Sequence, residues 1–314
     1  MKKKVLVFGG GTGLSTLLKG LKQFPIDITA VVSVSDNGKS TGKLRQEFHI
    51  PAVGDIRRVL LSLSETEPLF EKVWNYRFDD KSSLEGHTIG NLLLTAMIDI
   101  NGNMSSGMES LGKVLNLKGS VLPFTEENVT LMAEMEDGKI IEGEHEITTY
   151  NSNIKDIFYK EEVSVNPSVL EKIKEADLII LSMGSLYTSI LPNLISNQVI
   201  DAINDSEARI VYVCNMMTQP GETDDYTVSK HVEVCNKYLK KNIDGVIINN
   251  GEISDEIKHK YETMEQKDPV IIDQEELDKL NVECIANDYV KIEDGVLRHN
   301  VDKLALDIYT YLVR

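Results

Sequence analysis

The chain has 314 residues, of which 41% are hydrophobic and 26% are charged, so it can bury a large core in one domain or two. Its formal net charge is −17, which leaves no overall positive field and makes nucleic acid and anionic membrane surfaces poor partners. No apolar run approaches the roughly 18 residues of a membrane span. We therefore predict no membrane insertion and a cytoplasmic location. The three cysteines, Cys214, Cys235 and Cys284, have no metal-binding spacing and are expected to be reduced thiols.

The first half of the chain opens with a strand, a loop and a helix. A short apolar run at 5–8 ends in glycines, and leucines then recur at helical spacing as far as Leu21. A second β-branched run covers 28–34. Helical patterns follow at 56–63, 69–76, 91–100 and 104–115.

The pattern changes at about 120–150, where strands are predicted at 129–135 and 140–147 around an Asp137-Gly138 hairpin turn. Alternation of strands and helices then resumes, and it predicts a doubly wound, mostly parallel sheet with helices on both faces. No linker-like composition appears, so we predict one α/β domain over 1–314 with a small antiparallel β insertion, whose apolar strands offer a homodimer surface. The later strands are expected at 178–181, 210–213, 246–248 and 270–272, and a closing helix at 301–312.

Small and polar residues follow five of the predicted strands. In an open parallel sheet the carboxyl ends of the strands meet at one edge, where ligands bind. Five such loops predict a ligand crevice, whereas a single glycine loop would be weak evidence. The loops are 9–13, 35–38, 182–189, 215–223 and 249–252.

The first loop, Gly9-Gly10-Gly11-Thr12-Gly13, predicts phosphate binding, because its backbone can approach a phosphate and the next helix directs N–H groups toward it. The dinucleotide fingerprint is only approximate, since Thr16 occupies the third glycine position. A dinucleotide such as NAD thus stays an alternative. A P-loop reading of Gly38-Lys39-Ser40 fails, because Ser33 stands where the first glycine is required.

Several polar residues keep two interpretations. Asp36 and Asn37 contact a metal or a ligand hydroxyl, or they form an Asx-type turn. Asp55 caps the helix that follows, and Arg57 either supplies a phosphate cation or lies exposed beside that cap. His87 is either a packed structural residue or part of the site. No nucleophile-plus-base pattern or metal-protease motif appears, so the residues alone predict a binding site without a reaction.

Taken together, these loops resemble the YvcK-like gluconeogenesis factors. The resemblance runs from the first strand to the last helix. It is carried by the blocks 9–15, 35–45, 54–57, 86–92, 184–194, 217–223 and Arg298-His299.

The resemblance implies a Rossmann-like α/β fold shared with the 2-phospho-lactate transferases of deazaflavin cofactor synthesis. It also implies binding of UDP-sugars such as UDP-N-acetylglucosamine or UDP-glucose, a cytoplasmic role in cell shape and envelope synthesis during gluconeogenic growth, and partners among envelope-synthesis proteins. No established catalytic activity comes with this branch, so we lean against an enzyme. The nucleotide-contacting residues expected from the motifs are Gly9, Gly10, Gly11, Thr12, Gly13, Asp36, Asn37, Ser40, Gly54, Asp55, Arg57, His87, Asn91, Gly184, Ser185, Tyr187, Asn215, Thr218, Gln219 and Arg298.

Three departures from the family pattern stand out. The acidic loop after the second strand usually has two adjacent acids, and Asn37 replaces the second, which weakens the alternative of a metal-dependent transferase with Mg²⁺ or Mn²⁺ at Asp36. Ser182-Met183 stands where the family has Gly-Pro. Near the C-terminus, Val301 replaces a threonine, so no hydroxyl is present there for phosphorylation.

Overall fold

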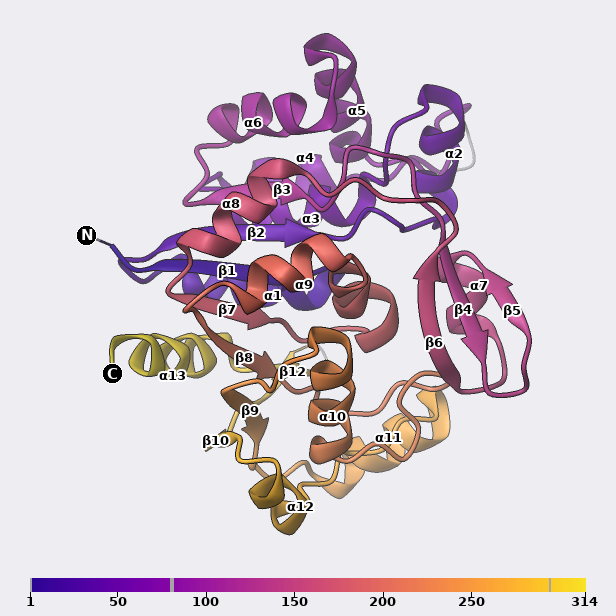
Figure 1. Cartoon of the computed structure of the whole chain (residues 1–314). Helices are drawn as coiled ribbons and strands as arrows, with labels where there is room; N and C mark the ends of the chain where they lie inside the picture. Colours follow the sequence, from indigo (N-terminus) through magenta and orange to yellow (C-terminus); the bar gives the residue numbers. More distant parts are fainter. Residues whose placement is uncertain (1, 80–81, 294) are drawn as a thin grey trace.

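A parallel sheet with helices on both faces forms the body of the protein in the computed structural model, which describes residues 2–79, 82–293 and 295–314 (Figure 1). The sheet has seven strands in the order β10-β9-β8-β7-β1-β2-β3, and every pairing in it is parallel. The predicted doubly wound α/β class is therefore confirmed. The strands are β1 (Lys4–Gly9), β2 (Asp27–Val32), β3 (Ser120–Pro123), β7 (Leu178–Leu181), β8 (Arg209–Val213), β9 (Gly245–Asn249) and β10 (Glu283–Asn287).

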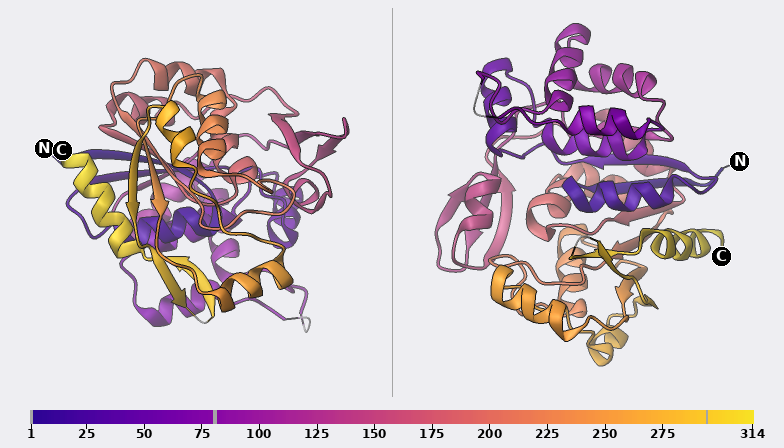
Figure 2. Two further views of the ribbon diagram at one scale, coloured as in Figure 1. Left: turned by 90° about the horizontal axis from the view of Figure 1, so that it is seen from below. Right: turned by 180° about the vertical axis from the view of Figure 1, so that it is seen from behind.

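The central strands are buried on both faces, as parallel strands require. In β1, Val5 and Val7 point into one hydrophobic core, and Leu6 and Phe8 point into the other. One helical layer faces the viewer in Figure 1, and the other faces the viewer in the view from behind in Figure 2. The first core is covered by α1 (Gly11–Leu21), α3 (Gly54–Leu63), α5 (Ile89–Asn101), α6 (Met104–Val114) and α13 (Val301–Val313), and the second by α8 (Pro167–Glu175), α9 (Asn197–Asn204), α10 (Val228–Leu239) and α12 (Gln274–Lys279).

Local sequence explains where several of these helices begin. Thr88 caps α5 by accepting a hydrogen bond from the Asn91 N–H, and Asn300 caps α13 in the same way. The positive φ of Gly102 ends α5. The remaining helical segments are α2 (Lys39–Phe48), α4 (Pro68–Asn75), α7 (Glu144–Thr149), α11 (Asp255–Glu265), η1 (Leu186–Ile190) and η2 (Leu191–Leu194).

The antiparallel insertion lies beyond the carboxyl ends of the main strands (Figure 1). It is a three-stranded sheet in the order β5-β4-β6, and the predicted Asp137-Gly138 turn joins β4 to β5. The predicted bounds of 120–150 are shifted, because 120–123 pairs with β2 in the main sheet and a third strand follows 150. Its strands are β4 (Leu131–Met135), β5 (Ile140–Glu142) and β6 (Ile154–Tyr159).

One predicted strand is shorter than expected, and another is absent. The strand expected at 140–147 ends at Glu142, because Gly143 turns the chain with a φ of 97° and α7 begins at the next residue. The run 270–272 is a loop in which Ile271 is 67% exposed, and β10 takes the sheet edge instead. A C-terminal hairpin of β11 (Val290–Glu293) and β12 (Val296–His299) completes the described fold.

Candidate functional site

A cavity of about 600 Å³ opens at the carboxyl ends of β1, β7 and β8, where the strand order reverses. Its floor is formed by the predicted loops after these strands. Its opposite wall, called the C-terminal cap here, is formed by α11, residues 266–270 and the β11–β12 hairpin. The predicted residues that line it are Gly10, Gly11, Thr12, Gly13, Asp55, Gly184, Ser185, Asn215, Thr218, Gln219 and Arg298.

The glycine loop makes a close backbone contact with the loop after β7. A Cβ on Gly13 would lie 1.9 Å from the Met183 carbonyl oxygen, so no larger residue fits there. Gly11 opens α1 with a φ of 57°, a conformation that favours glycine. Gly9 is buried beneath the loop, where a Cβ would meet Ser182. These glycines therefore allow the loops after β1 and β7 to pack closely, and they also leave room for a ligand to approach the backbone.

Asp55 occupies the start of α1, where a phosphate was expected. The predicted cap role is wrong, because α3 begins at Gly54 and has no side-chain cap bond. The Asp55 carboxylate instead accepts a hydrogen bond from the Gly11 N–H and pairs with Arg58 at 3.3 Å. Burial, followed by the nearby charge of Asp36, raises the pKa of Asp55 to about 6. The Asp55 carboxylate thus occupies the Gly11 N–H, which would otherwise be free to bind a phosphate of the ligand.

Asp36 and Asn37 take different roles after β2. Asp36 Oδ1 accepts a hydrogen bond from the Gly38 N–H at 2.8 Å, which is the predicted Asx-type turn, while its charge also faces Asp55. Asn37 accepts a hydrogen bond from the His145 N–H and donates one to Glu146, both at 2.9 Å. Asn37 therefore ties this loop to the first turn of α7.

The insertion contributes Glu144 to the cavity lining, which the sequence analysis did not anticipate. Burial raises the pKa of Glu144 well above its usual range, and the charges of Asp36 and Asp55 add to this effect. Nothing in the sequence singles out Glu144 among the 50 acidic residues, because only the docking of α7 brings it to this edge.

Ser185 forms a hydroxyl–carboxylate pair with Glu222. The Ser185 Oγ lies 2.7 and 2.9 Å from the two Glu222 carboxylate oxygens, and the Tyr187 N–H also donates to Glu222. Glu222 is 2% exposed, and burial raises its pKa to about 6. The two residues are far apart in sequence, so the pair could not be recognised from local spacing.

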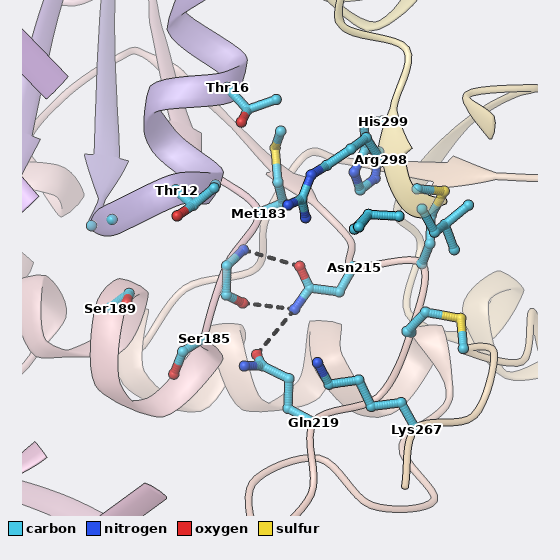
Figure 3. A pocket seen from close by; sticks show the side chains of 18 of the residues that line it. Thr12, Thr16, Met183, Ser185, Ser189, Asn215, Gln219, Lys267, Arg298 and His299 are labelled. Carbon is cyan, nitrogen blue, oxygen red and sulfur yellow. Dashed lines mark hydrogen bonds between the residues drawn. The ribbon is translucent and has the colours of Figure 1, made fainter. Parts of the chain in front are cut away.

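Asn215 fixes the backbone at Gly184 (Figure 3). Its Oδ1 accepts from the Gly184 N–H at 3.0 Å, and its Nδ2 donates to the Gly184 carbonyl at 2.6 Å. Thr218 is similarly engaged, because it exchanges two hydrogen bonds with Asp268 of the C-terminal cap. Asn215 and Thr218 therefore position the walls of the cavity, and Gln219 lies beside them.

The remaining predicted residues lie outside the lining of this cavity. Ser40 accepts from Asn91 and bonds the His87 ring, each at 3.1 Å, in a buried cluster of their own. Arg57 is buried, not exposed, and its Nη1 donates to Asn75 at 2.6 Å. Burial lowers the pKa of Arg57 to about 10. Tyr187 is also buried, and its hydroxyl bonds Tyr226 at 2.9 Å.

Three cationic side chains, Arg58, Lys267 and Arg298, line the cavity together with the carboxylates Asp55, Glu144 and Glu265. Arg298 reaches toward Asn215 from β12, and Lys267 extends toward Gln219 (Figure 3). His299 is neutral at pH 7, because burial lowers its pKa to about 4. In a chain of net charge −17, the three cations thus balance the three carboxylates around this cavity.

The carboxylates are too dispersed for an all-protein metal cage. Within the described residues, no group of three or more His, Cys, Asp or Glu side chains could hold a metal ion. Asp36 and Asp55 nevertheless lie close enough for their charges to interact beside the glycine loop. One or two carboxylates completed by phosphate oxygens and water suit Mg²⁺, so this pair fits a metal that arrives with a nucleotide.

Comparison with known proteins agrees with this architecture. The family model for 2-phospho-L-lactate transferase CofD matches residues 5–290. The chain belongs to the CofD family. It is 47% identical over 306 residues to the gluconeogenesis factor of Bacillus subtilis strain 168, covering 97% of this chain and 96% of that one. The gluconeogenesis factor of Halalkalibacterium halodurans is 46% identical, with 97% and 95% covered.

A solved structure gives the same result. The crystal structure of protein BH3568 from Bacillus halodurans superposes with a TM-score of 0.95 at 44% sequence identity, and each chain is covered completely. These matches identify the chain as a gluconeogenesis factor-like member of the family, as the loop motifs predicted. In the described part of the chain, no helix is long and apolar enough to cross a membrane.

Proposed function

We propose that this protein is a cytoplasmic regulatory protein that binds a nucleotide-sugar, UDP-N-acetylglucosamine or UDP-glucose, in the cavity at the carboxyl edge of the sheet. The observation that carries this proposal is a large cavity with a glycine loop on one wall and cations of the C-terminal cap on the other. Its role is in cell shape and envelope synthesis during gluconeogenic growth, where envelope-synthesis proteins are its expected partners.

The cavity supports a ligand of this class on size and chemistry. Ligand sites of roughly 300–1,000 Å³ are usual for small molecules and cofactors. Thr12, Ser185, Ser189 and Gln219 offer polar groups for a sugar or ribose, while Met217 and the buried Leu297 provide apolar surface for a base.

Calorimetry on the purified protein with UDP-N-acetylglucosamine tests the proposal. Saturable binding is expected, and Arg298→Gln should weaken it because a cation of the cavity wall is lost. Arg314→Gln is the matched control, since Arg314 is exposed and pairs with Glu283 away from the cavity. Absence of wild-type binding up to millimolar ligand would overturn the proposal.

The second candidate is a metal-dependent transferase that uses a nucleotide diphosphate-linked donor. It is favoured by the Asp36 and Asp55 carboxylates beside the glycine loop and by the family's description. A bound Mg²⁺ would neutralise developing phosphate charge. The protein's own residues would hold the donor and exclude water.

Mg²⁺-dependent or Mn²⁺-dependent turnover lost in Asp36→Asn would support the transferase. This variant keeps an oxygen that can accept from the Gly38 N–H, so it removes charge with little change to the turn. Full activity in Asp36→Asn would exclude Asp36 as a metal ligand.

A further inference from the structure

The C-terminal cap supplies a cation, Lys267, that the loop motifs do not include. Of the three cations on the cavity, Arg58 lies next to the predicted block 54–57 and pairs with Asp55 at 3.3 Å. Arg298 belongs to the predicted set. Lys267 follows α11 and comes from outside every predicted ligand loop.

The backbone on both sides of Lys267 is fixed. Its N–H donates to the Tyr261 carbonyl at the end of α11 at 3.2 Å. The next residue, Asp268, accepts from the Thr218 N–H at 2.8 Å and donates to the Thr218 Oγ1 at 3.0 Å. The backbone at Lys267 is therefore held in place by α11 and by the loop that follows β8.

The side chain is held within the cavity wall. It is 29% exposed, against 38–74% for the other described lysines in ion pairs. Its ammonium pairs with Glu265 at 2.7 Å. Because an ammonium has three N–H donors, the pair with Glu265 leaves donors for a second acceptor in the cavity.

We propose that Lys267 binds a phosphate oxygen of the nucleotide-sugar, from the wall opposite the glycine loop. This inference rests on the proposed function and names a residue that selects diphosphate-bearing ligands. The Asp55 carboxylate already accepts from the Gly11 N–H, so a phosphate near this loop meets negative charge. The positive charge of Lys267 on the C-terminal cap offsets the repulsion between Asp55 and the phosphate. A lysine ammonium is a compact positive charge that commonly binds phosphate oxygens.

The test is calorimetry with UDP-N-acetylglucosamine on wild type, Lys267→Gln, Lys267→Arg and the control Lys279→Gln, at low and high salt. Lys279 forms a similar ion pair with Glu276 on the surface, at 2.6 Å. Lys267→Gln should weaken binding about tenfold or more, the size of one charged hydrogen bond. Its affinity should also depend less on salt, because an electrostatic contact is missing. Lys267→Arg should recover part of the loss.

Three results would count against the assignment. Unchanged affinity in Lys267→Gln, with wild type binding normally, overturns the role of Lys267 alone. A loss of affinity with an unchanged salt dependence assigns Lys267 a structural role and overturns the phosphate contact. If wild type itself fails to bind, the proposed function fails together with this inference.

Discussion

Asp55 should lower the stability of the free protein at neutral pH, and replacing it with Asn should stabilise the fold. Its side chain is 13% exposed, and its pKa rises from 3.8 to about 6 on folding. Because one pKa unit corresponds to about 1.4 kcal/mol, the ionised carboxylate costs about 3 kcal/mol at pH values above both pKa values. The shift is a net value that already includes the attraction of Arg58. Asp55→Asn should therefore gain up to about 3 kcal/mol.

The pH dependence has a defined sign. Between pH 3.8 and about 6 the folded state binds more protons at Asp55 than the unfolded state, so the stability contributed by this group falls as pH rises through that window. At about pH 5 roughly half of the cost remains. The advantage of Asp55→Asn should accordingly be largest near pH 8 and shrink toward pH 5.

Urea unfolding followed by circular dichroism, at both pH values, measures this difference. Asp99→Asn is the control, because it makes the same chemical change on the exposed surface of α5. A variant less stable than wild type at pH 8, or a gain that does not shrink toward pH 5, would refute the reasoning. A confirmed gain would mean that the carboxylate is kept for the site and not for the fold.

Three further substitutions probe the walls of the cavity and the attachment of α7. Gly13→Ala should destabilise the protein by about 3 kcal/mol or more, because its Cβ would meet a backbone oxygen that cannot move away. Thermal unfolding measures this loss, with Gly112→Ala as the control, since a Cβ there would meet a flexible leucine side chain. A loss in Gly13→Ala no greater than in the control would contradict the prediction. Asn215→Ala should release the Gly184 backbone and weaken UDP-N-acetylglucosamine binding in calorimetry, whereas wild-type affinity would show that the two hydrogen bonds are dispensable. Asn37→Asp should place a carboxylate against Glu146 and speed amide hydrogen exchange in 144–149, and unchanged exchange there would argue against the tie to α7.

The strongly apolar or strongly periodic segments could be predicted from the sequence. The runs at 5–8, 178–181 and 210–213 are buried on both faces, so their composition alone indicates parallel strands. The apolar run at 270–272 has similar composition but lies in a loop, because membership of a sheet also depends on which segment reaches the open edge. The edge strand β10 is only partly buried and gave no such signal.

The chain's own residues determined the parallel α/β class, its most apolar strands, the five polar loops at one edge and, through their motifs, the family. These features are local, since each depends on the periodicity or the residue types of a short segment. Tertiary structure alone decided that the Asp55 carboxylate reaches the start of α1, that α7 brings Glu144 into the cavity and that the C-terminal cap adds Lys267. Each of these placements joins segments tens or hundreds of residues apart. The packing of the whole core fixes their separation, and no short window of sequence contains that information.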